Sequence, residues 1–314
     1  TEVDLSNCTS LTSIESYTFS NCSELTSITL PSSLTSIGGS AFEGCSGLTS
    51  ITLPSSLTSI GNGAFSGCTN LQPSVTDQGV KYLGNSENPY LVLWDGTDIT
   101  TSSYTVNEKC KFIYNAAFEA CSGLKSIDLS NCTSLTSILS GAFSGCRGLT
   151  SITLPSNLTS IGSYAFDNCS SLTSIDLSNC TNLTRIGVRA FRGCSGLTSI
   201  DLPSSLTSIG EQAFLGCSGL TSITLPSSLT TIGSYAFENC TGITSVTINE
   251  YVFRNVTSTS SSCGYILGYI DSGETVLVPA NLIDDLGLTN SYLNGSSFTR
   301  SATAVDGYYV YTKI

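Results

Sequence analysis

One stretch of the sequence decides the fold: Leu48-Thr-Ser-Ile51-Thr-Leu53-Pro54, then Leu57-Thr-Ser-Ile60-Gly61, then Ala64-Phe65-Ser-Gly-Cys68. In its first part, apolar Ile51 and Leu53 alternate with polar Ser50 and Thr52, which predicts a short strand with one buried face. Proline ends that strand, and the second part predicts another short extended segment on the opposite wall. The glycine then allows a turn, and the Ala-Phe-x-x-Cys corner directs Phe and Cys into the core.

Copies of this text recur along the chain with a nearly fixed period. The successive spacings of the repeat phenylalanine are 23, 23, 53, 25, 23, 25, 23 and 23 residues. Nine phenylalanines define this register: Phe19, Phe42, Phe65, Phe118, Phe143, Phe166, Phe191, Phe214 and Phe237. A period in the twenties is typical of leucine-rich repeats, in which each coil adds one strand to a parallel sheet and cannot bury its core alone.

The 25-residue form of the repeat follows the general leucine-rich pattern LxxLxLxxN/CxL. Its example is Leu124-Lys-Ser-Ile127-Asp-Leu129-Ser-Asn-Cys132-Thr-Ser-Leu135. Both forms keep Leu and Ile in phase, so both can stack. The sequence therefore predicts a leucine-rich-repeat solenoid, a right-handed coil with a parallel β-sheet, short second strands, corners made of turns or 3-10 segments, and a β-rich C-terminal cap.

The text LPxSLTSIGxxAFxxCxxL resembles the Treponema-type, or BspA-like, leucine-rich repeats of bacterial surface proteins. The resemblance covers residues 1 to about 248 in nine copies. It implies a bacterial protein at the cell surface or secreted, with a role in adhesion to host matrix proteins. It supplies no residue motif for binding that could be transferred to this chain.

Two regions depart from the period. We expect a solenoid over residues 1–248, a β-hairpin inserted at about 72–109, and a non-repetitive cap over 249–314. The insertion contains Val80–Leu83, the turn residues Gly84–Pro89, and Tyr90–Trp94; coil geometry resumes with Cys110-Lys-Phe-Ile113. In the cap, strands are predicted at 265–270, 275–278 and 308–312 and a short helix at 280–286. Because residues 3–8 match the middle of the 25-residue form, we expect the chain to begin inside a coil.

Composition excludes several classes of function. The chain has 314 residues, a net charge of -12 and only 11% charged residues against 40% hydrophobic ones. Its pI of about 4.2 argues against nucleic acid and against insertion into or binding to an anionic membrane. No run of about 18 apolar residues is present. The sequence has no His, which removes the common catalytic triads and His-based zinc sites, so we expect no enzyme activity, no cofactor and no metal.

The fourteen cysteines follow the repeat rather than a disulfide framework. Nine follow the repeat phenylalanine by three residues, three occupy the Asn-Cys-Thr slot, and Cys110 and Cys263 are the two others. Equivalent positions in a parallel stack lie about 4.8 Å apart, whereas disulfide Cβ atoms are about 3.8 Å apart. We therefore expect a ladder of buried, reduced thiols. The twelve repeat cysteines are Cys8, Cys22, Cys45, Cys68, Cys121, Cys132, Cys146, Cys169, Cys180, Cys194, Cys217 and Cys240.

Three surfaces are candidates for partner binding, and each has a plain structural alternative. The insertion carries Trp94, Tyr82 and Tyr90, which depart from the repeat and could be partly exposed or could pack on the neighbouring coils. A basic cluster could receive an acidic partner or could be a solvated loop. An outward column of Ser, Thr and Asp could bind a glycan or peptide or could simply be a polar face. The basic cluster is Arg185, Arg189 and Arg192, and the acidic positions are Asp128, Asp176 and Asp201.

Two classes of function remain. The first is a monomeric cell-surface or secreted module for protein interaction and adhesion, with host or extracellular-matrix proteins or glycans as partners. The alternative is a protein that binds or processes carbohydrate through its C-terminal region, which is rich in tyrosine.

Overall fold

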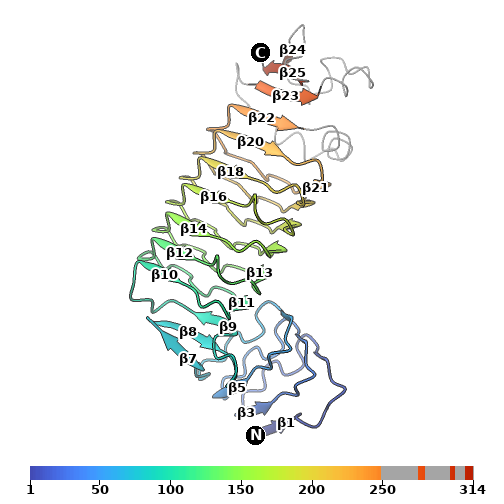
Figure 1. The fold of residues 1–314 in the computed structure, drawn as a ribbon, viewed down its shortest axis with the longest axis vertical. Coiled ribbons are helices and arrows are strands. Elements are labelled where there is room, and N and C mark those ends of the chain that lie inside the picture. Colours follow the sequence, from blue (N-terminus) through green and yellow to red (C-terminus); the bar gives the residue numbers. More distant parts are fainter. Residues whose placement is uncertain (249–274, 280–297, 301–307, 314) are drawn as a thin grey trace.

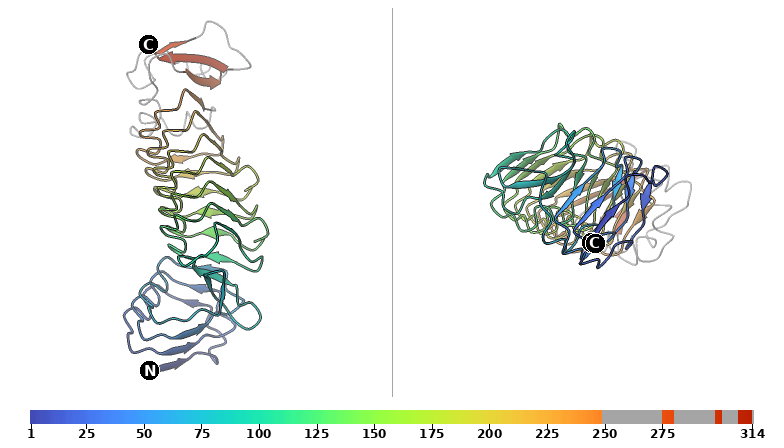
Figure 2. Two further views of the ribbon diagram at one scale, coloured as in Figure 1. Left: turned by 90° about the vertical axis from the view of Figure 1, so that its left-hand side faces the viewer. Right: turned by 90° about the horizontal axis from the view of Figure 1, so that it is seen from below.

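The computed structural model describes residues 1–248 and, further on, the strands at 275–279, 298–300 and 308–313. The described part contains strands and turns and no helix. The chain winds into an elongated coil with two columns of short strands (Figures 1 and 2). This architecture confirms the predicted leucine-rich-repeat solenoid.

Each regular turn of the coil contributes one strand of three or four residues to the first column, which we call the main face. Its members are β1 (Glu2–Asp4), β3 (Ser27–Thr29), β5 (Ser50–Thr52), β10 (Ser103–Thr105), β12 (Ser126–Asp128), β14 (Ser151–Thr153), β16 (Ser174–Asp176), β18 (Ser199–Asp201), β20 (Ser222–Leu225) and β22 (Ser245–Ile248). Paired strands are parallel and in the register of the repeat, so that Ile28 lies opposite Ile51.

The second column consists of shorter strands on the opposite wall. Its members are β2 (Ser13–Ile14), β4 (Ser36–Ile37), β6 (Ser59–Ile60), β9 (Val92–Asp95), β11 (Phe112–Ile113), β13 (Ser137–Ile138), β15 (Ser160–Ile161), β17 (Arg185–Ile186), β19 (Ser208–Ile209) and β21 (Thr231–Ile232). Two further strands, β7 (Val75–Asp77) and β8 (Val80–Leu83), extend this column from β9 in antiparallel fashion.

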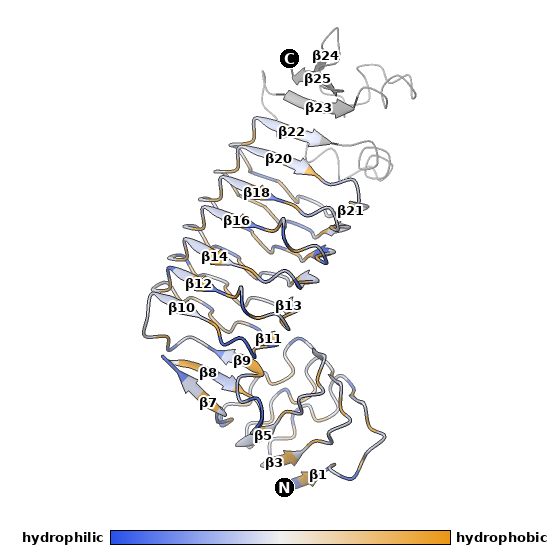
Figure 3. Ribbon diagram, in the orientation of Figure 1, coloured by the Kyte–Doolittle hydropathy of each residue, from blue (hydrophilic) through white to orange (hydrophobic). Residues whose placement is uncertain are grey.

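Alternation along each main-face strand matches the expected burial. In β5, Ile51 is buried between the exposed Ser50 and Thr52, and Leu53 is buried just after the strand. The main-face strands from β12 to β22 are mostly pale in Figure 3, the colour of intermediate hydropathy, because Ser, Thr and Asp flank single apolar residues. The apolar surface is therefore inside the coil.

Threonine occupies a structural position that composition alone does not reveal. A Thr precedes most main-face strands and donates its hydroxyl to a main-chain carbonyl of the preceding coil, as from Thr198 to Thr173 at 3.1 Å. A second ladder lies beside the shorter strands, as from Thr207 to Thr184 at 3.0 Å. Because these hydroxyls are used between coils, the abundance of Thr reflects stacking.

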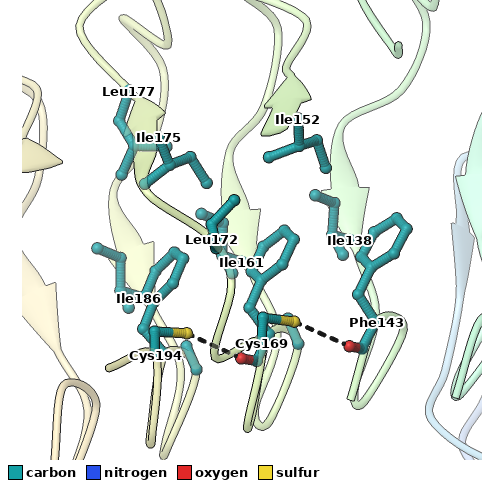
Figure 4. Close-up of a cluster of buried hydrophobic side chains, with 14 of the residues drawn as sticks. Ile138, Phe143, Ile152, Ile161, Cys169, Leu172, Ile175, Leu177, Ile186 and Cys194 are labelled. Atoms are coloured by element: carbon teal, nitrogen blue, oxygen red, sulfur yellow. Dashed lines mark hydrogen bonds between the residues drawn. The ribbon is translucent and has the colours of Figure 1, made fainter. Parts of the chain in front are cut away.

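Phenylalanine and cysteine form the corner of the core. Successive phenylalanine rings stack in parallel, as Phe166 on Phe191 with centroids 5.2 Å apart. The thiol of Cys169 donates to the carbonyl of Phe143 at 3.1 Å, and Cys194 repeats this contact one coil later (Figure 4). The described cysteines are free thiols, so the ladder is made of thiol–carbonyl contacts. The expectation of burial is wrong for Cys8 and Cys22, which are exposed in the first described coil, where their thiols do not contact a preceding repeat phenylalanine.

The corner also needs two left-handed backbone positions in each coil, four residues apart. Glycine occupies both positions in the coil of Phe65, at Gly63 with φ 67° and Gly67 with φ 73°. Other coils use side-chain residues there, such as Ala116 and Ala120. Left-handed φ costs about 1–2 kcal/mol for a residue with a Cβ, so the stack compensates for this cost with its inter-coil contacts.

The last strands continue the main-face sheet beyond the coils. β23 (Thr275–Pro279) pairs in parallel with β22, and β25 (Tyr308–Lys313) pairs antiparallel with both β23 and β24 (Phe298–Arg300). The strands predicted at 275–278 and 308–312 are thus present. The predicted strand at 265–270, the predicted helix at 280–286 and Cys263 lie outside the described residues.

Candidate functional site at the junction of two stacks

The solenoid contains two hydrophobic cores, separated by strands β7, β8 and β9, which we call the junction layer. The core of the coils at residues 14–71 and the core of the coils from residue 104 onward both receive side chains from this layer. Val80, Tyr82 and Leu93 belong to the second core, whereas Leu83 and Val92 belong to the first. The layer lies between the blue and the green coils in Figure 1. The inserted hairpin contains the antiparallel pair β8 and β9, and it lies within the stack and does not project from it, because β9 also pairs in parallel with β11.

The tip of this hairpin is also held against the preceding coil. The amide of Asn85 donates to the carbonyl of Leu53 at 2.7 Å, and the main-chain N–H of Leu53 donates to the carbonyl of Gly84 at 3.2 Å. The hairpin is consequently part of the structural framework along its whole length.

The phenylalanine column is interrupted at the junction. The main-chain N–H of Gly96 donates to the carbonyl of Ala117, and the Gly96 carbonyl accepts the thiol of Cys121, which are the contacts that a repeat phenylalanine makes in other coils. Gly96 therefore occupies a phenylalanine slot. A Cβ there would come within 2.2 Å of the Phe118 ring, so only glycine fits. The first column of rings ends instead on Tyr114, whose ring is tilted by 45° against Phe65 at 6.0 Å.

The corner hydrogen bonds are interrupted in the same place. In regular coils the main-chain N–H of the second left-handed residue donates to the next coil, as from Gly44 to Ser66 and from Gly145 to Asp167, both at 2.7 Å. The equivalent N–H of Gly67 makes no hydrogen bond within the described structure. Two neighbouring donors are satisfied by side chains: Phe65 N–H by the Tyr114 hydroxyl at 2.6 Å, and Gly63 N–H by Asn115 Oδ1 at 3.2 Å.

This interruption leaves a cleft of about 400 Å³ between the two stacks, which we call the junction cleft. One wall is the corner from Gly63 to Thr69, and the other contains Trp94, Asp95 and residues 114–116. Ser66, Gly67 and Thr69 are exposed along the first wall, and Trp94 is partly buried against the first core. The indole N–H of Trp94 has no hydrogen-bond partner among the described residues.

The charged residue that lines the cleft, Asp95, forms an ion pair with Lys81, which also contacts Asp98. Lys81 Nζ lies 2.8 Å from Asp95 Oδ2 and 2.7 Å from Asp98 Oδ2. Burial raises the pKa of Asp95, but hydrogen bonds from Lys81 and Thr97 outweigh it, and the pKa falls below its ordinary value. Asp95 is thus ionised near neutral pH and neutralised by Lys81.

The three aromatic residues of the insertion have different environments. Tyr82 is 0% exposed and shares a hydrogen bond of 2.8 Å with the Tyr104 hydroxyl, so for this residue the structure agrees with the packing alternative and not with partial exposure. Tyr90 is partly buried and packs edge-on against Tyr82. Trp94 lines the cleft and stays a candidate for binding.

The basic cluster is largely committed to contacts within the chain. Arg192 forms a bidentate ion pair with Asp167, at 2.7 and 3.1 Å. The Arg189 guanidinium bonds to Gln212 and to the Tyr164 hydroxyl and lies 5.6 Å from the centre of that ring. Arg185 is exposed on β17 and makes no ion pair in the described structure. Arg189 and Arg192 thus bind side chains of neighbouring coils and help the coils to stack. Arg185 has no such contact in the described structure.

The three acidic positions lie on the main face, and two of them cap turns. Oδ1 of Asp128 accepts the N–H of Ser130 at 2.9 Å, and Oδ1 of Asp176 accepts that of Ser178 at 2.8 Å. Such a cap explains why Asp occurs in the 25-residue form, whereas Thr usually stands in the 23-residue form, where proline follows. Asp201 lies directly opposite Asp176 in the parallel sheet. The described residues contain no group of three or more potential metal ligands.

Sequence reasoning missed Gly67, Tyr114 and Asn115 as residues of the cleft, although a signal for Tyr114 was present. Four residues before the repeat phenylalanine most coils have glycine, because a Cβ at Gly61 would lie 2.3 Å from the Gly39 nitrogen of the preceding coil. Tyr114 stands in this glycine slot before Phe118. A large ring fits there only where the preceding coil is displaced.

The described residues contain no helix with the length and apolar character that a membrane span requires. The parallel strand register, the hydrogen-bond ladders of Thr and Cys, and the Phe-Cys corners define a leucine-rich-repeat scaffold. The model of the BspA type leucine rich repeat region matches this chain in six copies, over residues 1–87, 97–194 and 180–266. The chain belongs to the BspA-type leucine-rich-repeat family.

Several solved structures are similar to the chain, and no curated protein sequence matches it. A leucine-rich repeat protein from Eubacterium ventriosum is 26% identical over 73% of this chain and 80% of its own, with a TM-score of 0.38. A leucine rich cell surface protein from Faecalibacterium prausnitzii is 23% identical over 76% and 77%, with a TM-score of 0.30. The leucine rich repeat protein of T. pallidum is 23% identical over 55% and 71%, with a TM-score of 0.37.

Proposed function

We propose that the chain is a cell-surface or secreted interaction module that adheres to host or extracellular-matrix partners, and that recognition centres on the junction cleft. One observation carries this proposal. In regular coils the corner N–H groups and Thr hydroxyls are used in stacking, whereas at the junction the Gly67 N–H and the Trp94 indole N–H are free in the described structure. Large aromatic residues with a polar edge are enriched among the residues that dominate binding energy.

The other candidate surfaces are less suited to a specific site. The main face repeats small hydroxyls from coil to coil and offers few large side chains for anchoring a partner. Arg189 and Arg192 would have to leave partners within the chain in order to bind an acidic ligand. The C-terminal region, where the sequence favours the carbohydrate alternative, lies mostly outside the described residues.

A pair of aromatic substitutions tests this proposal. Trp94→Ala should weaken binding to immobilised matrix proteins by about thirtyfold, equivalent to a loss of about 2 kcal/mol at a true hot spot. Tyr17→Ala is the matched control, because Tyr17 is 67% exposed and lies in a coil away from the cleft. Biolayer interferometry measures both, with thermal unfolding to verify the fold. Unchanged binding by a folded Trp94→Ala protein would contradict the proposal and indicate that the partner binds at the main face or the C-terminal region.

A further inference from the structure

We infer that the junction cleft binds one neutral sugar ring of a glycan, with Trp94 as its apolar platform and the Gly67 N–H and the Ser66 and Thr69 hydroxyls as hydrogen-bonding partners. This inference rests on the proposed function, because it names the ligand class of the same cleft.

The cleft has the size of a site for a small group. Its volume of about 400 Å³ lies near the lower end of the range found for sites that hold small molecules. One pyranose ring with part of a neighbouring sugar fits such a volume. A glycan can place one sugar ring inside the cleft while its other sugars lie over the exposed corner at Ser66 and Thr69.

The walls suit a ligand with one apolar face and a polar rim. Trp94 gives an aromatic surface with an unpaired N–H at its edge, and Tyr114 on the same wall and Phe65 on the opposite wall add apolar lining. A pyranose has a face of C–H groups that packs on an aromatic ring and a rim of hydroxyls that bond to polar edges. A purely apolar side chain would leave the indole N–H unpaired and shielded from water, which is costly.

Unpaired polar groups lie on the opposite wall. The Gly67 N–H lacks the acceptor that its equivalents have in the next coil, and the Ser66 and Thr69 hydroxyls make no hydrogen bond in the described structure. Sugar hydroxyls both donate and accept, so they can satisfy a fixed N–H donor and rotating hydroxyls at once. These three groups come from one stretch of four residues, 66–69, so a single ring can reach them together.

Charge selects a neutral sugar. Asp95 is the charged residue that lines the cleft, and it is already paired with Lys81. The lining therefore offers no free cation for a sulfate or a carboxylate, and an anionic sugar would be repelled by the chain's net charge of -12. A neutral hexose or N-acetylhexosamine meets neither obstacle.

The test uses the intrinsic fluorescence of the protein, because Trp94 is the one tryptophan of the sequence. A glycan array first selects neutral glycans, and the corresponding methyl glycosides and oligosaccharides are then titrated while Trp94 emission is recorded. Ser66→Arg fills the mouth of the cleft from an exposed position. Ser144→Arg is the matched control, because Ser144 also directly follows a repeat phenylalanine but lies in a regular coil. Thr69→Arg is a second blocking variant in case Ser66→Arg does not fold.

We expect a saturable change in emission with a neutral glycan, weakened at least tenfold by Ser66→Arg or Thr69→Arg and unchanged by Ser144→Arg. Binding of anionic glycans only, or neutral binding that neither blocking variant alters, would overturn the sugar site. Failure of every neutral glycan to bind would also overturn it. The proposed function would still be supported in that case if Trp94→Ala abolished binding to matrix proteins, which would indicate a protein segment as the occupant.

Discussion

At the scale of single residues, the repeat assigns most side chains a contact with the next or the preceding coil. The cysteine thiol shows this most clearly, since its proton is used in a hydrogen bond to a phenylalanine carbonyl. Burial raises the pKa of Cys110 and of Cys169 to about 12, and that of Cys132 to about 11. These thiols therefore stay protonated in the folded chain at pH values where free cysteine ionises.

The raised pKa values predict a loss of stability at alkaline pH. A thiol whose pKa is higher in the folded state contributes stability that is complete below the unfolded pKa of about 8.5 and is lost as pH rises toward the folded value of about 12. In this window each such thiol lowers the free energy of unfolding by up to about 1.4 kcal/mol per pH unit. Urea unfolding between pH 7 and 11 measures this slope.

Serine variants isolate the thiol contribution. Cys169→Ser keeps a hydroxyl donor for the Phe143 carbonyl but does not titrate in this range, so it should reduce the slope. Cys22→Ser makes the same substitution at an exposed thiol and is the matched control. Equal slopes for the parent and Cys169→Ser would contradict a buried, protonated ladder.

At the scale of elements, the single coil is the unit of structure, and the repeat sequence was sufficient to predict how each coil folds. The identity of the inward residues, the parallel register and the phenylalanine column all follow from repetition, because nine copies constrain one geometry. The junction layer has a single copy, so its pairing and its two faces could not be inferred in this way. Tyr82 illustrates the difference: the sequence left open whether it is partly exposed or packed on the neighbouring coils, and the structure shows that it is fully buried.

The position of a coil in the stack determines how much its phenylalanine contributes. Phe166 is fully buried and stacks on Phe143 and Phe191, so Phe166→Ala should lower the free energy of unfolding by about 3–5 kcal/mol. Phe19 is partly exposed and stacks only on Phe42 within this chain, so Phe19→Ala should cost clearly less. Chemical denaturation measures both variants. A loss below about 1 kcal/mol for Phe166→Ala would contradict the coil register.

At the scale of the whole molecule, the scaffold is two stacks joined by a layer that contributes side chains to both cores. Gly96 and Tyr114 mark where the repeat is broken, one by leaving a phenylalanine slot empty of side chain and the other by filling a glycine slot. The break creates the cleft and frees the polar groups that our proposals use. The candidate site thus depends on irregular residues, whose placement needed the structure, although the sequence already singled out Trp94.

Native-state hydrogen exchange, resolved by residue with NMR, tests this break most directly. Gly44, Gly67 and Gly145 occupy the same left-handed corner position, and only the Gly67 N–H among these three lacks an acceptor in the next coil. We predict that the Gly67 amide exchanges nearly as fast as an unprotected amide, while Gly44 and Gly145 exchange at least roughly a hundredfold more slowly. Equal protection at all three glycines would mean that the corner ladder is continuous through the junction, and the cleft with its free donors would not exist.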